Sequence, residues 1–155
     1  MLKLANVSFG GTSAIVTSTA LIVGFSATAA SVPPMIAGLL ILGVADNITD
    51  SLSIHVYQES ERLKARPAFP ATLSNFATRL AISLTFVLLV LSLPAAYALY
   101  PSIAWGLSLL TGLTWLVARQ RGASVAREVC KHVAAAVLAV AVSRAIGMLI
   151  LAYFH

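Results

Sequence analysis

The sequence predicts an all-α integral membrane protein, a single domain over residues 1–155 that forms a bundle of five transmembrane helices. Hydrophobic residues make up 59% of the chain and charged residues only 10%, whereas a soluble domain carries about 25% charged residues. Residues 4–45 and 80–118 contain no charged side chain, and both runs exceed the roughly 20 apolar residues that cross a bilayer as a helix. Basic residues cluster between these apolar runs.

The first apolar run is long enough for two helices. "SVPP" at 31–34 divides it, because proline cannot continue a helix and restricts the residue before it. We therefore expect helices at 10–30 and 34–57. One alternative stays open at this point: Lys3, the apolar stretch and "ATA" at 27–29 imitate a cleavable signal peptide, although the stretch exceeds the usual core of roughly 7–15 residues.

The second half predicts three further helices. A polar, proline-containing connector follows the second helix, and "YPS" at 100–102 then divides the next apolar run into helices at 73–98 and 102–119. The basic, glycine-containing segment "RQRGASVARE" leads to a fifth helix at 131–154. Small residues recur every four positions along this helix, a spacing that allows membrane helices to approach closely; they are Ala135, Ala139, Ser143 and Gly147.

The basic residues predict how the helices are oriented, because loops rich in Lys and Arg stay in the cytoplasm. With five spans, the N-terminus and both basic connectors share one side, whereas the loops at 31–33 and 100–102 carry no charge. We expect a cytoplasmic N-terminus, and the short loops favour the inner (plasma) membrane of a prokaryote. The basic residues on the cytoplasmic side are Lys3, Arg62, Lys64, Arg66, Arg119, Arg121, Arg127 and Lys131.

The acidic residues are concentrated in the second predicted helix and its end, which hold four of the five in the chain. At 100° per residue, five polar groups share one face of this helix, and Asp46 is expected near the middle of the membrane. His55 and Glu59 fall on the opposite face. The five polar groups are Asp46, Asp50, Ser53, Tyr57 and Glu61.

Two carboxylates one helical turn apart require compensation, because a charged side chain at membrane depth costs about 2.5–3.5 kcal/mol on insertion scales. One interpretation is a cation or proton pathway. The other is a buried ion pair between Asp46 and Arg144, the charged residue about halfway along the fifth predicted helix, which would hold two helices together. Since Arg144 could neutralise only one of the two aspartates, we favour the pathway.

Two stretches resemble the vacuolar iron transporter family. "FGGTSAIVTSTALIVGF" (9–25) is similar to its first helix, and "AGLLILGVADNITDSLSIHVYQESE" (37–61) to its second. The resemblance places the family's second-helix acid on Asp46 and its serine on Ser53. The positions of the first-helix aspartate and of the second-helix methionine hold Ser13 and Ile54 instead. The family's cytosolic metal-binding segment between the second and third helices is missing.

The resemblance implies a homodimer of five-helix protomers that moves divalent metal ions, iron or manganese, in exchange for protons. The expected metal-ligating residues are Asp46 and Asp50, with Ser13 and Ser53 as weaker oxygen ligands. At the cytoplasmic mouth we expect Glu59, Glu61 and His55 to attract cations. The alternative function is a membrane scaffold or assembly subunit that keeps the fold without transport.

Other classes are not favoured. The catalytic motifs of metalloproteases and phosphate-binding enzymes are absent from the sequence, so we expect neither an enzyme nor a resident cofactor. The net charge of +5 is distributed over the connectors, which suits anionic lipid headgroups better than nucleic acid. Cys130 is the only cysteine, so an intrachain disulfide is excluded.

Overall fold

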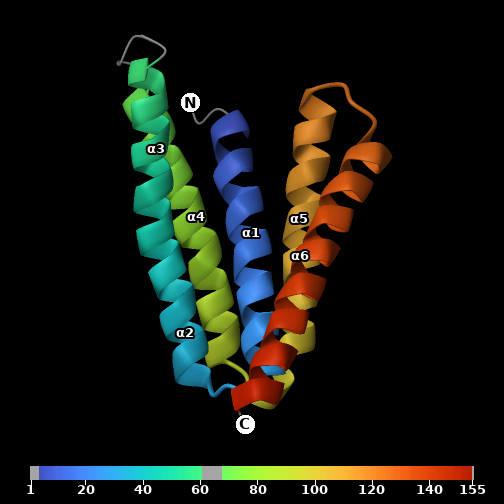
Figure 1. Ribbon diagram of the computed structural model, residues 1–155. Helices are drawn as coiled ribbons and strands as arrows, with labels where there is room; N and C mark the ends of the chain where they lie inside the picture. The colour runs from blue at the N-terminus through green and yellow to red at the C-terminus, as the bar shows by residue number, and fades with distance from the viewer. Residues whose placement is uncertain (1–3, 61–67, 155) are drawn as a thin grey trace.

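A computed structural model describes residues 4–60 and 68–154. Within these ranges the chain is entirely helical, with short connections (Figure 1). The elements are α1 (Leu4–Ala27), α2 (Val32–Ile41), the π-helix η1 (Leu42–Asp46), α3 (Asn47–Ser60), α4 (Ala68–Leu91), the 3₁₀ turn η2 (Ala95–Tyr97), α5 (Leu99–Gln120) and α6 (Val125–Phe154).

These elements form five long helical rods, each of which is long and apolar enough to cross a membrane. One of them is composite, because α2, η1 and α3 follow one another without a break. The predicted all-helical architecture with five potential spans is thereby confirmed, and it suggests a multi-pass membrane protein.

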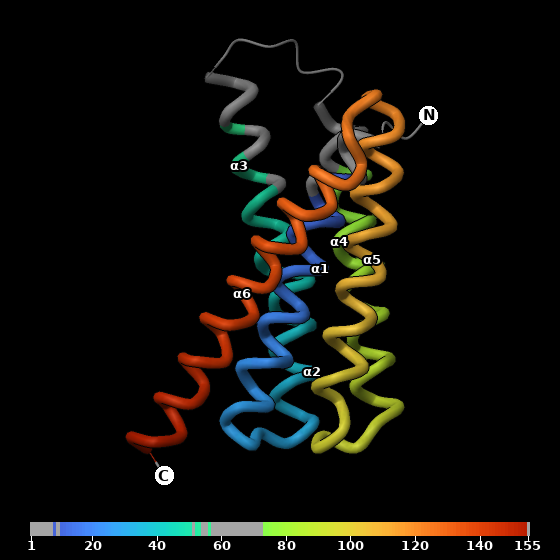
Figure 2. The backbone as a smooth tube through the Cα atoms, turned by 90° about the vertical axis from the view of Figure 1, so that its right-hand side faces the viewer, coloured from blue at the N-terminus to red at the C-terminus, as the bar shows by residue number. Residues whose placement is uncertain are grey.

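The helix α1 lies at the centre of the bundle. It contacts α4, α5 and α6 along its length and α2 near its end, and Figures 1 and 2 show the other helices arranged around it. The chain begins at the end of the bundle where α5 connects to α6, and α6 ends at the opposite end (Figure 1).

An apolar core fills the half of the bundle that is remote from the N-terminus. Ile22 of α1, Phe86 and Val90 of α4, and Met35 and Leu39 of α2 are all buried there in one cluster. Nearer the N-terminus the packing of α4 against α1 and α3 is polar instead, with Asn47, Asn75 and Arg79 buried. This change from apolar to polar packing positions the candidate site.

Several helix boundaries differ from the prediction. The predicted helix 73–98 ends already at Leu91, because Pro94 cannot continue it. Pro101 does not separate two helices, since it lies in the first turn of α5, where the missing proline N–H has no helical acceptor in any case. The first and last helices begin earlier than predicted, at Leu4 and Val125.

The contact between α1 and α6 depends on small residues, as the four-residue spacing predicted. Ser143 donates a hydrogen bond from Oγ to the carbonyl of Ala20. Gly147 is buried, and a Cβ atom there would lie 2.4 Å from the carbonyl oxygen of Gly24. The other end of the predicted stripe does not take part, because Ala135 is exposed.

Candidate functional site

The two aspartates lie at the junction of η1 and α3, midway along the composite rod. Asp46 is the last residue of the π-helix, and Asp50 lies in the first turn of α3. Gly43 permits this irregular segment to lie close to α4, since a Cβ atom there would come within 3.2 Å of Ser83 Cβ. Single π turns inside α-helices are frequent at functional sites.

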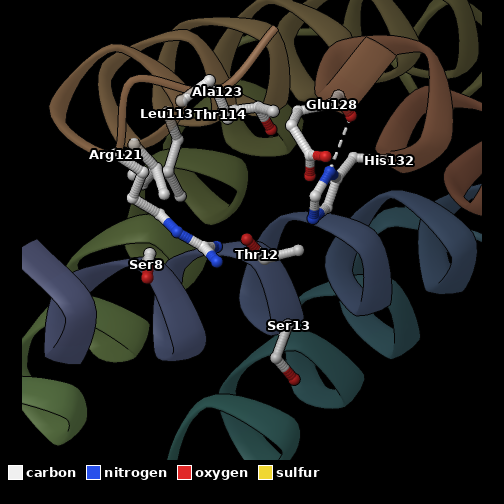
Figure 3. A pocket seen from close by; sticks show the side chains of 11 residues that line it. Ser8, Thr12, Ser13, Leu113, Thr114, Arg121, Ala123, Glu128 and His132 are labelled. Carbon is white, nitrogen blue, oxygen red and sulfur yellow. Dashed lines mark hydrogen bonds between the residues drawn. The ribbon is translucent and has the colours of Figure 1, made fainter. Parts of the chain in front are cut away.

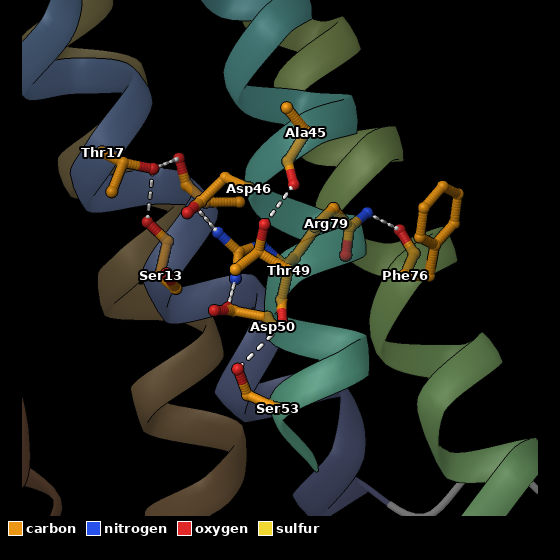
Figure 4. A network of polar contacts seen from close by, with 11 residues as sticks. Ser13, Thr17, Ala45, Asp46, Thr49, Asp50, Ser53, Phe76 and Arg79 are labelled. Atoms are coloured by element: carbon orange, nitrogen blue, oxygen red, sulfur yellow. Dashed lines mark hydrogen bonds and ion pairs between the residues drawn. The ribbon is translucent and has the colours of Figure 1, made fainter. Parts of the chain in front are cut away.

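Arg79 of α4 lies between the two carboxylates. Its Nη2 bonds to Asp46 Oδ2 and its Nη1 to Asp50 Oδ2 (Figure 4). The side chain of Arg79 is only 3% exposed, whereas those of Asp46 and Asp50 are 39% and 33% exposed. The arginine is therefore buried behind the acids, and the acids retain an open side.

The alternative interpretation, an ion pair between Asp46 and Arg144, is wrong. Arg144 is exposed on α6, whereas Asp46 bonds to Arg79. The reason is topological: α3 packs against α4, and α6 packs against α1 and α5. An arginine on α4 therefore reaches the acids directly.

Arg79 belongs to a row of buried polar residues on α4. Asn75, Arg79 and Ser83 are four residues apart and are 3%, 2% and 6% exposed; we call them the α4 polar row. Gly10 of α1 allows close packing against it, because a Cβ atom there would meet Asn75 and Arg79. In the described part of the chain, the Asn75 amide has no hydrogen-bond partner. The Nδ2 and Oδ1 atoms of Asn75 are therefore available for other hydrogen bonds.

A hydrogen bond from Asn47 holds the start of α3 against α4. Asn47 is fully buried, and its Nδ2 donates a hydrogen bond of 2.8 Å to the carbonyl oxygen of Phe76. This bond fixes the residue next to Asp46 against the helix that carries Arg79. The acids are thus held in register with the α4 polar row by a side chain that carries no charge.

On α1, the side chains of Ser13 and Thr17 lie on the side that faces the acids (Figure 4). Thr17 and Ser13 are half-buried, and Thr17 Oγ1 donates to the Ser13 carbonyl at 2.8 Å. Ser53 is exposed, and its hydroxyl donates to the carbonyl of Thr49 at 2.9 Å. The site therefore combines two carboxylates with hydroxyl oxygens from α1 and α3.

The expected cytoplasmic mouth is only partly described. Glu61 lies outside the described residues, and the side chains of His55 and Glu59 are not among those the structure describes. Among the side chains that are described, no three His, Cys, Asp or Glu residues gather as a metal-binding group. The part of the predicted site that the structure does place is the pair Asp46 and Asp50, with Ser13 and Ser53 beside it.

Arg79 is the residue of the candidate site that the sequence prediction missed. It lies halfway along α4 and is the charged residue closest to the start of the second apolar run. The pattern that identifies it is the four-residue spacing of Asn75, Arg79 and Ser83, which marks a polar face on a helix otherwise apolar enough to cross a membrane.

The fold and the site together suggest a class: an all-helical, multi-pass membrane protein with an acid–arginine cluster within two of its candidate spans. Comparison with family models, with curated proteins and with solved structures gave no match.

Proposed function

We propose that the protein transports divalent metal ions past Asp46 and Asp50. The observation that carries this proposal is the charge balance: two carboxylates face one arginine, and both carboxylates are about one-third exposed. A residual negative charge at membrane depth attracts a cation. Intramembrane acids of this kind mark ion and proton routes.

The donor atoms suggest which ions are bound. Carboxylate and hydroxyl oxygens are hard ligands, which suit Mn²⁺, Mg²⁺ and similar ions better than soft metals. Ile54 stands where the vacuolar iron transporter family, which the sequence resembles, has a methionine, so no thioether from that position joins the site. Iron or manganese as cargo, and exchange against protons, follow from that resemblance.

Arg79 acts in this proposal as the resident counter-charge. Its guanidinium bonds to both carboxylates, and an arriving divalent ion would take over these oxygens. When the ion leaves, the arginine bonds to the acids again, which keeps them from holding the metal permanently. The Asn75 amide, one helical turn from Arg79, can accept the displaced guanidinium.

Single replacements of the acids test the proposal. In proteoliposomes, Asp46→Asn and Asp50→Asn are each expected to lower Mn²⁺ or Fe²⁺ uptake at least tenfold, because the remaining carboxylate is neutralised by Arg79. Both variants should stay folded, since Arg79 keeps one acidic partner. The matched control is Thr49→Val on the same helix, whose hydroxyl donates only to the Ala45 carbonyl; uptake should be unchanged.

The second candidate function is that of a scaffold or assembly subunit. In that case the ion pairs of Arg79 with Asp46 and Asp50 would be permanent. Arg79 favours it, because its side chain is 3% exposed and bonded to both acids. The uptake assay separates the two candidates. A scaffold would transport none of Fe²⁺, Mn²⁺, Mg²⁺ and Co²⁺ at any pH gradient, and that result would refute transport.

The proposed topology places the N-terminus in the cytoplasm of a prokaryotic cell and the protein in its inner membrane as a homodimer. A chain with Cys130→Ser and Tyr100→Cys should react with an impermeant thiol reagent added from outside, because Tyr100 is 74% exposed at the uncharged end of the bundle. Ser124→Cys, in the basic connector, should react only after the cells are opened. The reverse pattern would overturn the orientation.

A further inference from the structure

A polar cavity lies between α1, α5 and α6, near the α5–α6 connection. Its volume is about 580 Å³. Of its lining residues, only Ser13 also lies beside Asp46 and Asp50. Three charged or titratable side chains line it, namely Arg121, Glu128 and His132 (Figure 3). The metal-transport proposal makes no use of these three groups.

One side of the cavity donates hydrogen bonds. The Arg121 guanidinium points into it above Thr12 and Ser8 (Figure 3). Thr114, which also lines the cavity, is only 5% exposed. No hydrogen bond of its hydroxyl to another of the described residues is found, so this hydroxyl can donate to a bound group. A guanidinium with hydroxyl groups beside it matches the oxygens of a phosphate.

The other side accepts hydrogen bonds. His132 Nδ1 lies 2.8 Å from the carbonyl oxygen of Glu128. A carbonyl can only accept, so Nδ1 donates this bond, and in the tautomer that is protonated at Nδ1 the other ring nitrogen, Nε2, is an acceptor. The Glu128 carboxylate lies beside this ring (Figure 3). Lys131 binds Glu128 Oε1 at 3.0 Å, which leaves the second oxygen. These two acceptors suit an ammonium group.

The remaining wall is apolar, and the cavity lies where a membrane surface is expected. Leu113, Val117 and Ala118 line it beside the polar groups. The candidate span of α5 ends at Gln120, directly before Arg121. Nearby, the Arg119 guanidinium lies 5.0 Å from the centre of the Trp115 ring, and tryptophan is typical of the interface between membrane and water.

We propose that this cavity binds a phosphate–ammonium zwitterion, and specifically the headgroup of a phosphatidylethanolamine-type lipid. Arg121, Thr12 and Thr114 bind the phosphate, while Glu128 and His132 accept the N–H groups of the ammonium. The apolar wall holds the beginning of the acyl chains. A purely anionic headgroup fits less well because Glu128 repels it, and a trimethylated ammonium lacks the N–H groups that the acceptors need.

Native mass spectrometry of the purified full chain tests this proposal with four probes: phosphatidylethanolamine, phosphatidylcholine, phosphatidylglycerol and free phosphoethanolamine. The ethanolamine lipid should be retained at least tenfold better than the other two lipids. Equal retention of the three lipids would overturn the proposal. Free phosphoethanolamine that binds as tightly as the lipid would assign the cavity to a soluble ligand instead.

Variants locate the binding within the cavity. Arg121→Gln and the nearly isosteric Thr114→Val should each lower retention of the ethanolamine lipid at least fivefold. Glu128→Gln should remove the preference over phosphatidylglycerol. Arg119→Gln is the control at the same helix end, because its side chain stacks on Trp115, and it should bind as the unaltered protein does. Unchanged retention in the Thr114→Val and Arg121→Gln proteins, with melting temperatures unaffected, would refute the site.

Discussion

Replacing Arg79 with methionine is expected to destabilise the protein by about 3 kcal/mol, more than any other single loss of charge in the bundle. Methionine preserves the bulk of the side chain but leaves two carboxylates facing each other without a cation. Removing one partner of a buried ion pair costs about 3–5 kcal/mol. We expect a loss at the lower end of this range because both aspartate side chains are about one-third exposed. Denaturant unfolding in mild detergent measures the change.

A rescue and a control make this prediction specific. The triple variant Arg79→Met, Asp46→Asn, Asp50→Asn removes all three charges and should recover most of the lost stability. Arg144→Met is the matched control, since Arg144 is exposed on α6 and has no acidic partner among the described residues. If Arg144→Met destabilised the protein as strongly as Arg79→Met, the assignment of Arg79 as the counter-charge would be contradicted.

Replacing Gly147 with leucine is expected to separate α6 from α1. Even the first added carbon would lie 2.4 Å from the Gly24 carbonyl oxygen and 2.8 Å from Ala27 Cβ. The nearest obstacle is backbone, which cannot rotate away as a side chain can. Overpacking usually costs about 1–3 kcal/mol, and we expect a loss at or above the upper end of this range. It would appear as a lower melting temperature and weaker protection of α6 from proteolysis.

Gly112 on α5 provides the comparison, because a Cβ atom there would have no neighbour within 4 Å. Gly112→Leu should change stability by less than about 0.5 kcal/mol, as surface substitutions usually do. Leucine replaces glycine within a helix in both variants, so helix propensity is matched. Equal melting temperatures for the two variants would show that the contact between α1 and α6 does not contribute to the fold.

Composition was sufficient to predict the class of fold. Long uncharged runs that exceed the length of a membrane span leave little choice of architecture, and five helices of that kind are present. The spacing of Asp46 and Asp50 also predicted that the two acids act together, since one helical turn brings both to the same partner, Arg79.

The basic residue that binds Asp46 and Asp50 could not be predicted from the positions of these two residues alone. The position of a residue within a predicted span indicates its depth in the membrane, and both Arg79 and Arg144 lie inside predicted spans. Which helix packs against α3 is a matter of tertiary packing, and α3 contacts α4. The break at Pro94 was missed for a similar reason: Pro94 and Pro101 both restrict the chain, and local sequence does not decide which of them ends a helix.

The π-helix η1 divides the composite rod into two parts that pack differently. Before it, Met35 and Leu39 of α2 are buried in the apolar core; Asp46 is its own last residue, and Asp50 follows in the first turn of α3. A π turn holds one residue more than the α turn it replaces, so a shift of this extra residue by one position rotates α3 about its axis while α2 stays in place. Such a rotation would turn Asp46 and Asp50 away from Arg79 without any hinge or loop. The helix that carries the two carboxylates could therefore release them from the arginine while it stays continuous.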